Sequence, residues 1–115
     1  MILAVLDDLM FSSKVKSAAA AIGRPVAFAR SAEKALEAMR QTTPALVIFD
    51  LNNPRIDTLA IVAAMKADPA LAGVETIAYA SHVHVDLMQA GRAAGISAVM
   101  ARSQFTQQLA EILSR

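Results

Sequence analysis

The sequence feature that most constrains the fold is a run of five apolar residues, 45–49, that ends on the carboxylate of Asp50. Three of the five are β-branched or aromatic, and such a run is typical of a strand buried on both faces of a parallel sheet. In open α/β sheets, ligands bind at the carboxyl ends of the central strands, because the helices diverge there and leave a crevice. Asp50 is therefore the first candidate for a functional side chain.

The rest of the chain repeats this pattern of short apolar runs separated by helical periodicity. Further strands are predicted at residues 2–6, 26–29, 76–80 and 97–101, and helices at about residues 9–22, 32–41, 57–67, 84–94 and 105–113. Strand and helix alternate five times with short connections and no Asn-Gly hairpin signal, which predicts a parallel five-stranded sheet with helices on both faces. We therefore expect a three-layer, doubly wound α/β fold in which residues 1–115 form one domain.

Apolar residues at helical spacing indicate the face that each helix turns toward the sheet. The expected inward residues are Val15, Ala18, Ala19 and Ile22 in the first helix; Ala32, Ala35, Leu36 and Met39 in the second; Leu59, Val62, Ala63 and Met65 in the third; and Phe105, Leu109, Ile112 and Leu113 in the last. Ser31 stands where the second helix should begin, and Gly23 and Gly95 stand where helices should end.

Composition excludes several classes of protein. With 56% hydrophobic and 18% charged residues the chain is too apolar to be disordered, and a net charge of +1 gives no basic footprint for nucleic acid. The chain has no cysteine, which excludes a zinc ribbon, a disulfide framework and a thiol nucleophile. The apolar N-terminus is too short for a signal peptide and no run is long enough to cross a membrane, so we expect a cytoplasmic protein.

Carboxylates follow two of the predicted strands, with Asp7 and Asp8 after the first and Asp50 at the end of the third. If these strands are neighbours, three like charges meet at one edge of the sheet, where each raises the pKa of the others. Such a cluster persists when a cation offsets it, and Mg²⁺, which binds carboxylates, water and phosphate oxygens, is the obvious candidate. The alternative for each Asp taken alone is an ordinary helix cap or turn former.

These residues make the whole chain similar to the receiver domains of response regulators in two-component signalling. The resemblance rests on Asp7-Asp8, on the segment 49–52 with Pro54, and on the fifth strand and last helix that follow Gly95. It implies a flavodoxin-like fold with strand order 2-1-3-4-5, in which the first and third strands are neighbours.

The resemblance also implies roles for single residues. Asp7, Asp8, Asp50 and the backbone carbonyl of Asn52 would hold Mg²⁺. Asp50 would be the phosphoacceptor, taking a phosphoryl group from a histidine kinase or a phosphotransfer protein.

Three positions depart from the family pattern. The fourth strand of a receiver ends in Thr or Ser, but a gap-free placement puts Ala80 there, with Ser81 one residue on as a hydroxyl that could replace it. The Lys-Pro pair after the fifth strand is matched by Arg102-Ser103, and the usual aromatic of that strand by Val99. Arg binds phosphate well, but its planar fork differs from a compact ammonium group. The residues that would bind the metal and accept the phosphoryl group match the family pattern, whereas the residues that would respond to phosphorylation differ from it.

This split leaves three functional hypotheses. The first is a working single-domain receiver in a phosphorelay, phosphorylated on Asp50, with Arg102 in place of Lys. The second is a pseudo-receiver, a module of the same fold that binds its partner without phosphorylation. The third is a Mg²⁺-dependent phosphohydrolase, which is disfavoured because no Asp-x-Asp pair surrounds Asp50 and no cap segment encloses a substrate. We therefore expect a signalling protein rather than an enzyme.

Partners follow from the same resemblance. Because no effector domain follows Arg115, output is expected to pass through a downstream protein target. In the family, partner and dimer contacts use the fourth helix, fifth strand and fifth helix, here about residues 84–115, so a homodimer would form there. Met10 and Phe11 would mark a partner surface if exposed, whereas His82 and His84 are expected to be surface residues rather than metal ligands.

Overall fold

A single parallel sheet organises the chain, and the computed structural model describes all 115 residues of it. The strands are β1 (Ile2–Val5), β2 (Val26–Ala29), β3 (Leu46–Asp50), β4 (Glu75–Ala80) and β5 (Ala98–Ala101), in the order β2-β1-β3-β4-β5. The helices are α1 (Leu9–Ala21), α2 (Ala32–Gln41), α3 (Thr58–Ala67), α4 (Val85–Ala93), α5 (Arg102–Gln107) and α6 (Leu109–Leu113). The predicted flavodoxin-like α/β fold and its strand order are confirmed.

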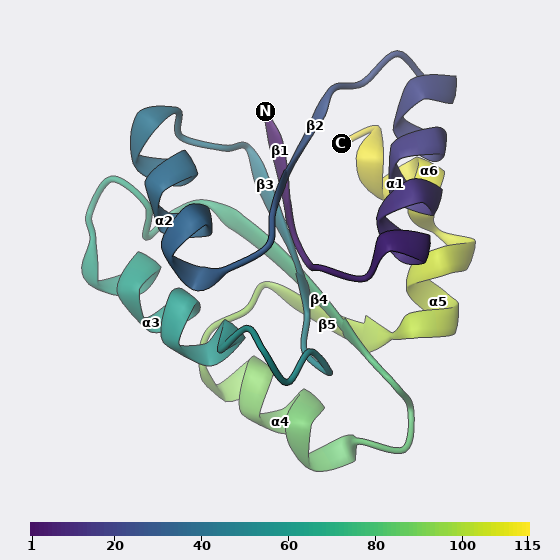
Figure 1. Cartoon of the computed structure of the whole chain (residues 1–115). Helices are drawn as coiled ribbons and strands as arrows, with labels where there is room; N and C mark the ends of the chain where they lie inside the picture. The colour runs from purple at the N-terminus through teal and green to yellow at the C-terminus, as the bar shows by residue number, and fades with distance from the viewer.

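Helices cover both faces of this sheet. Figure 1 shows α2, α3 and α4 on one face and α1, α5 and α6 on the other. Each face carries its own apolar cluster, of 16 and 15 buried residues. Because side chains alternate along a strand, Val47 and Phe49 join the first cluster and Leu46 and Ile48 the second. The near-equal clusters explain the continuous apolar run of β3, since both of its faces are buried.

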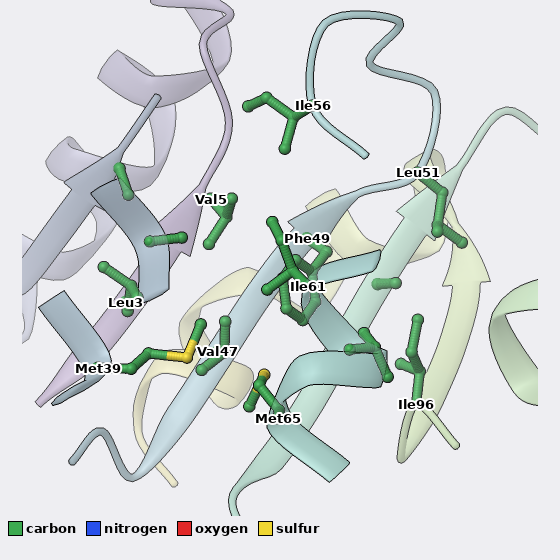
Figure 2. Packing of buried hydrophobic residues seen from close by; sticks show 14 of the residues in the cluster. Leu3, Val5, Met39, Val47, Phe49, Leu51, Ile56, Ile61, Met65 and Ile96 are labelled. Atoms are coloured by element: carbon green, nitrogen blue, oxygen red, sulfur yellow. The ribbon is translucent and has the colours of Figure 1, made fainter. Parts of the chain in front are cut away.

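The cluster under α2, α3 and α4 contains Phe49, which is fully buried. Figure 2 shows side chains from β1, β3, α2 and α3 meeting over the sheet, with Ile61 beside Phe49. Burial of this kind contributes about 25 cal/mol for each Å² of apolar surface removed from water. The first cluster therefore fixes α3 against β3, the strand that carries Asp50.

The register of the central strands brings the three carboxylates to one edge. β1 pairs with β3 in parallel, with Val5 opposite Phe49. Asp50 is the next residue of β3, and Asp7 and Asp8 follow β1 within three residues of Val5. The sequence predicted that the three carboxylates would converge if β1 and β3 were neighbours, and the structure shows that these strands are neighbours.

Helix ends coincide with residues that can cap them. The side chains of Asp8, Ser31 and Asp57 each accept a hydrogen bond of 3.1 Å from the backbone N–H three residues on, at the starts of α1, α2 and α3. Gly23 and Gly95 have φ of +68° and +99°, a left-handed conformation that side chains with a Cβ rarely adopt. The cap at Ser31 and the two glycine stops are confirmed.

Two predicted inward residues were wrong. Ile22 is 42% exposed because α1 ends at Ala21 and Ile22 forms its C-terminal cap, outside the buried stripe. Ala63 is exposed, and Ile61 is buried in its place. The inward row of α3 begins at Thr58, which is itself buried, so the helix is rotated relative to the expectation.

The predicted last helix is divided in two. Its stripe is confirmed, because Phe105, Leu109, Ile112 and Leu113 are all buried. Gln108, with φ of −99° and ψ of 9°, leaves the helical conformation and separates α5 from α6. The bend keeps both halves of the stripe against the second cluster. None of the helices has the length and apolarity that crossing a membrane requires.

Replacing Phe49 by Ala should lower the free energy of unfolding by about 3–5 kcal/mol, because it leaves a cavity at a fully buried position. Urea unfolding followed by circular dichroism measures this. Met10→Ala is the control: its side chain is 86% exposed, so the change should stay within about 0.5 kcal/mol. Equal losses in the two variants would contradict the assignment of the core.

Candidate functional site

Asp50 ends β3 half-buried at the carboxyl edge of the sheet. Its Oδ1 accepts a hydrogen bond of 2.9 Å from the N–H of Asn52, and its Oδ2 accepts none from the protein. Burial raises the pKa of Asp50 above its ordinary value, against the opposing effects of the Asn52 N–H and the charge of Arg102. The charges of Asp8 and Asp7 add to the rise in pKa. Asp50 therefore feels the other two carboxylates, as the sequence predicted, whereas the pKa values of Asp7 and Asp8 are lowered, so the predicted mutual rise was wrong for these two residues.

Asp7 is held by a cation from the loop after β3. Arg55 donates from Nε to Oδ2 of Asp7 at 2.7 Å and from Nη2 to Oδ1 at 3.0 Å, a two-pronged ion pair. Asn53 adds a third bond of 2.6 Å, from Nδ2 to Oδ1. The bond from Arg55 is the main reason why the pKa of Asp7 is lowered to about 2. Asp7 is thus a fully ionised carboxylate at neutral pH, with each oxygen occupied.

Asp8 combines two roles. Its Oδ1 caps α1 by accepting from the N–H of Phe11 at 3.1 Å, so the helix-cap alternative weighed for this residue holds. Its Oδ2 pairs with Nη2 of Arg102 at 3.3 Å. The Phe11 N–H, and then the Arg102 side chain, lower the pKa of Asp8 below its ordinary value. Both members of the acidic pair therefore carry an arginine partner.

Asparagines order the loop between β3 and α3. Asn53 is buried, and its Oδ1 accepts from the N–H of Arg55 at 2.9 Å, which sets the backbone from which Arg55 reaches Asp7. Asn52 uses its side-chain Oδ1 to accept from the N–H of Ser81 at 2.5 Å. This second bond ties the loop after β3 to the loop after β4. Sequence reasoning assigned Asn52 through its carbonyl alone and missed Asn53 and Arg55.

The ends of β4 and β5 complete the edge. β4 ends at Ala80, which is fully buried and has no hydroxyl, and Ser81 lies one residue past the strand. The backbone N–H of Ser81, rather than its hydroxyl, makes the contact to Asn52. Arg102 is the first residue of α5, and its side chain pairs with Asp8 rather than with Asp50. The geometry thus brings Arg102 to the acidic cluster and leaves the position of the usual hydroxyl apolar.

A cluster of three aromatic rings lies beneath Arg102. The rings of Phe11 and Phe105 flank Tyr79 with centroids 4.9 and 4.8 Å away, and the Arg102 guanidinium sits 4.5 Å above the Phe11 ring. Such stacking attracts a cation and restrains its orientation. The hydroxyl of Tyr79 is buried without a hydrogen-bond partner, and burial raises the pKa of that phenol. Phe11 is therefore part of the core, while Met10 beside it is the exposed residue of the pair.

Comparison of the sequence with protein-family models and with curated proteins gives no match. Comparison of the fold with solved structures does. The receiver domain of NtrX from Brucella abortus superimposes with a TM-score of 0.84 at 20% identity, over 100% of this chain and 96% of that one. The chain has the receiver-domain fold.

Two further neighbours of this fold differ in what their structures hold. The Mn²⁺-bound form of the response regulator Rcp1 has a TM-score of 0.81 at 19% identity, over 98% of this chain and 91% of that one. The phosphorylated cyanobacterial phytochrome response regulator RcpA has a TM-score of 0.77 at 20% identity, over 97% and 87%. At these identities the likeness establishes the fold, and the function has to be argued from the residues of the edge.

The residues at the edge of this receiver fold are of the types that bind a hard divalent cation. Their arrangement in the structure, however, does not form a binding site for one. Carboxylates and a backbone carbonyl are the oxygen donors that Mg²⁺ prefers. In the structure, however, no three acidic or imidazole side chains are grouped so that they could hold a metal. Both oxygens of Asp7 bond to Arg55 instead, and Asp8 uses Oδ2 for Arg102 and Oδ1 for the N–H of Phe11. A cation would fit only after these carboxylates exchange partners. His82 and His84 are exposed, and His84, which precedes α4, makes no side-chain cap hydrogen bond.

Replacing Asp50 by Asn should raise the free energy of unfolding at neutral pH. Because folding raises the pKa of Asp50, its ionised form destabilises the folded state above that raised pKa, and the cost vanishes below the unfolded value of 3.8. The gain in stability of Asp50→Asn should therefore shrink as the pH falls from about 7 to about 3. Urea unfolding at several pH values measures it.

Glu37→Gln is the matched control for this substitution, since Glu37 lies on the exposed side of α2. It should change the free energy of unfolding by less than about 0.5 kcal/mol at every pH. A loss of stability in Asp50→Asn at neutral pH, or a gain that does not vary with pH, would contradict the electrostatic account of the site.

Proposed function

We propose that the chain is a receiver domain of two-component signalling that accepts a phosphoryl group on Asp50. The observation that carries the proposal is the convergence of Asp7, Asp8 and Asp50 with Arg102 at one edge of a receiver fold. Asp50 has a free oxygen, a raised pKa and a fixed orientation through Asn52. A partly desolvated carboxylate of this kind is a suitable nucleophile.

The reaction is a transfer to oxygen. Oδ2 of Asp50 attacks the phosphorus of a phosphohistidine on a histidine kinase or phosphotransfer protein. An acyl phosphate forms as the P–N bond breaks, and the departing imidazole nitrogen takes the electron pair and then a proton. Because the transferred group carries its charge on peripheral oxygens, the protein's contribution is chiefly positioning and charge neutralisation. Arg102, already restrained above Phe11, is the cation closest in role to the lysine of other receivers.

Mg²⁺ belongs to the same proposal. Asp7, Asp8, Asp50 and the Asn52 carbonyl would hold it, and when bound it would neutralise charge on the phosphoryl oxygens. The Mn²⁺-bound and phosphorylated neighbours support this assignment by analogy. The product carries about two negative charges where the ionised Asp50 carried one, beside Asp7 and Asp8. Since Ala80 offers no hydroxyl, we expect the response to pass through the bond between Asn52 and Ser81.

Intact-mass measurement after incubation with Mg²⁺ and acetyl phosphate tests the proposal. We expect one phosphoryl adduct on the wild-type chain and none on Asp50→Asn, because among the three carboxylates of the edge only Asp50 has an oxygen without a hydrogen-bond partner. Labelling should stop at one group per chain, as suits a signalling protein rather than an enzyme. An adduct that survives in Asp50→Asn, or repeated turnover of the phosphodonor, would contradict it.

A second candidate is a pseudo-receiver, which binds its partner without phosphorylation. It is favoured by the apolar Ala80 and by the two arginines that already neutralise Asp7 and Asp8. A folded wild-type chain that gains no adduct from either acetyl phosphate or a kinase would favour this candidate. In both cases we propose a cytoplasmic protein that acts through a downstream protein target, with residues 84–115 as the surface for a partner or a second copy.

A further inference from the structure

Arg55 makes an interaction that the proposed function does not use. The Arg55 side chain is 70% exposed, whereas the Asp7 side chain that it binds is only 17% exposed. In this pair the carboxylate of Asp7 is largely shielded from solvent, whereas the Arg55 side chain faces solvent. Both prongs of the fork end on Asp7, and no other acidic side chain contacts Arg55.

The bonds of Asp7 show what Arg55 occupies. Oδ1 accepts from Asn53 as well as from Arg55, but Oδ2 accepts from Arg55 alone. Release of the guanidinium would free Oδ2 completely and leave Asp7 held in place by Asn53. The backbone N–H of Arg55 bonds to Oδ1 of Asn53, so the loop keeps its shape without the side chain. Oδ2 of Asp7 is thus a carboxylate oxygen whose single hydrogen-bond partner belongs to a largely exposed side chain.

We propose that Arg55 is a tethered cation that competes with the divalent metal for Asp7 and thereby sets the metal affinity of the site. The inference rests on the proposed function, since it concerns the same cluster. Only the Arg55 end of this pair is well exposed, so solvent can hydrate the guanidinium once it leaves Asp7. A metal ion can therefore displace Arg55 at modest cost, and the displaced guanidinium becomes available at the surface beside the phosphoacceptor.

Metal titration of Arg55→Gln tests this inference without reference to activity. The rise in thermal unfolding temperature with added MgCl₂ or MnCl₂ reports binding by mass action. Arg55→Gln should reach half-saturation at a metal concentration lower than that of the wild type by about fivefold, the value of a good exposed ion pair. Arg55→Lys, which keeps the charge but loses the fork, should fall between the two.

Two controls separate this contact from general charge effects. Arg40→Gln removes the same charge from the exposed end of α2, where the structure shows no ion pair, and should leave the metal midpoint unchanged. In an Asp7→Asn background, Arg55→Gln should have no further effect, because the two residues act through one interaction. Equal midpoints in wild type and Arg55→Gln, or binding in neither, would overturn the inference.

The intact-mass assay on the same variants distinguishes the two proposals. A normal Asp50 adduct with equal metal midpoints overturns the competition by Arg55 and leaves the proposed function standing. A shifted midpoint with no adduct in any variant, from either acetyl phosphate or a kinase, supports competition and overturns phosphorylation. Adduct formation that needs less Mg²⁺ in Arg55→Gln than in the wild type supports both.

Discussion

The carboxyl edge of this sheet depends on the repulsion between three carboxylates and on the cations that offset it. The fold makes the repulsion unavoidable, because β1 and β3 are parallel neighbours and carry Asp7, Asp8 and Asp50 to one place. Arg55 and Arg102 offset the charge of Asp7 and Asp8, whose pKa values are lowered. Asp50 has no such ion pair, and burial raises its pKa. The asymmetry distinguishes one reactive carboxylate from two that are neutralised.

The packing that supports this edge could be predicted from the sequence. Continuous apolar runs identified the strands, and their alternation with helices fixed a parallel sheet, because such runs must be buried on both faces. The resemblance supplied the strand order, which places β3, the strand that ends at Asp50, between β1 and β4. The helices were predicted less well: Ile22 and Ala63 were assigned to the core on spacing alone, which does not report where a helix ends or how it is rotated.

The candidate site was predicted only where a residue type and a strand end coincide. That rule found Asp7, Asp8 and Asp50, and the resemblance added Arg102. It could not find Arg55, whose role comes from the path of a loop rather than from any periodicity. Asn53 gave a weak signal, since an Asn before Pro is a common turn former. Nor does the sequence report that Ser81 contacts Asn52 through its backbone N–H, which depends on how two loops meet in space.

Amide NMR spectra recorded with Mg²⁺ before and after addition of acetyl phosphate test the account most directly, because each backbone N–H at the edge reports separately. We expect the largest shifts at residues 7–11, 50–55, 81 and 102, and no shift in Asp50→Asn. The Ser81 signal decides whether the response crosses from one loop to the next through Asn52. Unchanged spectra in the wild type, or the same shifts in Asp50→Asn, would contradict the assignment of this edge as the phosphoryl site.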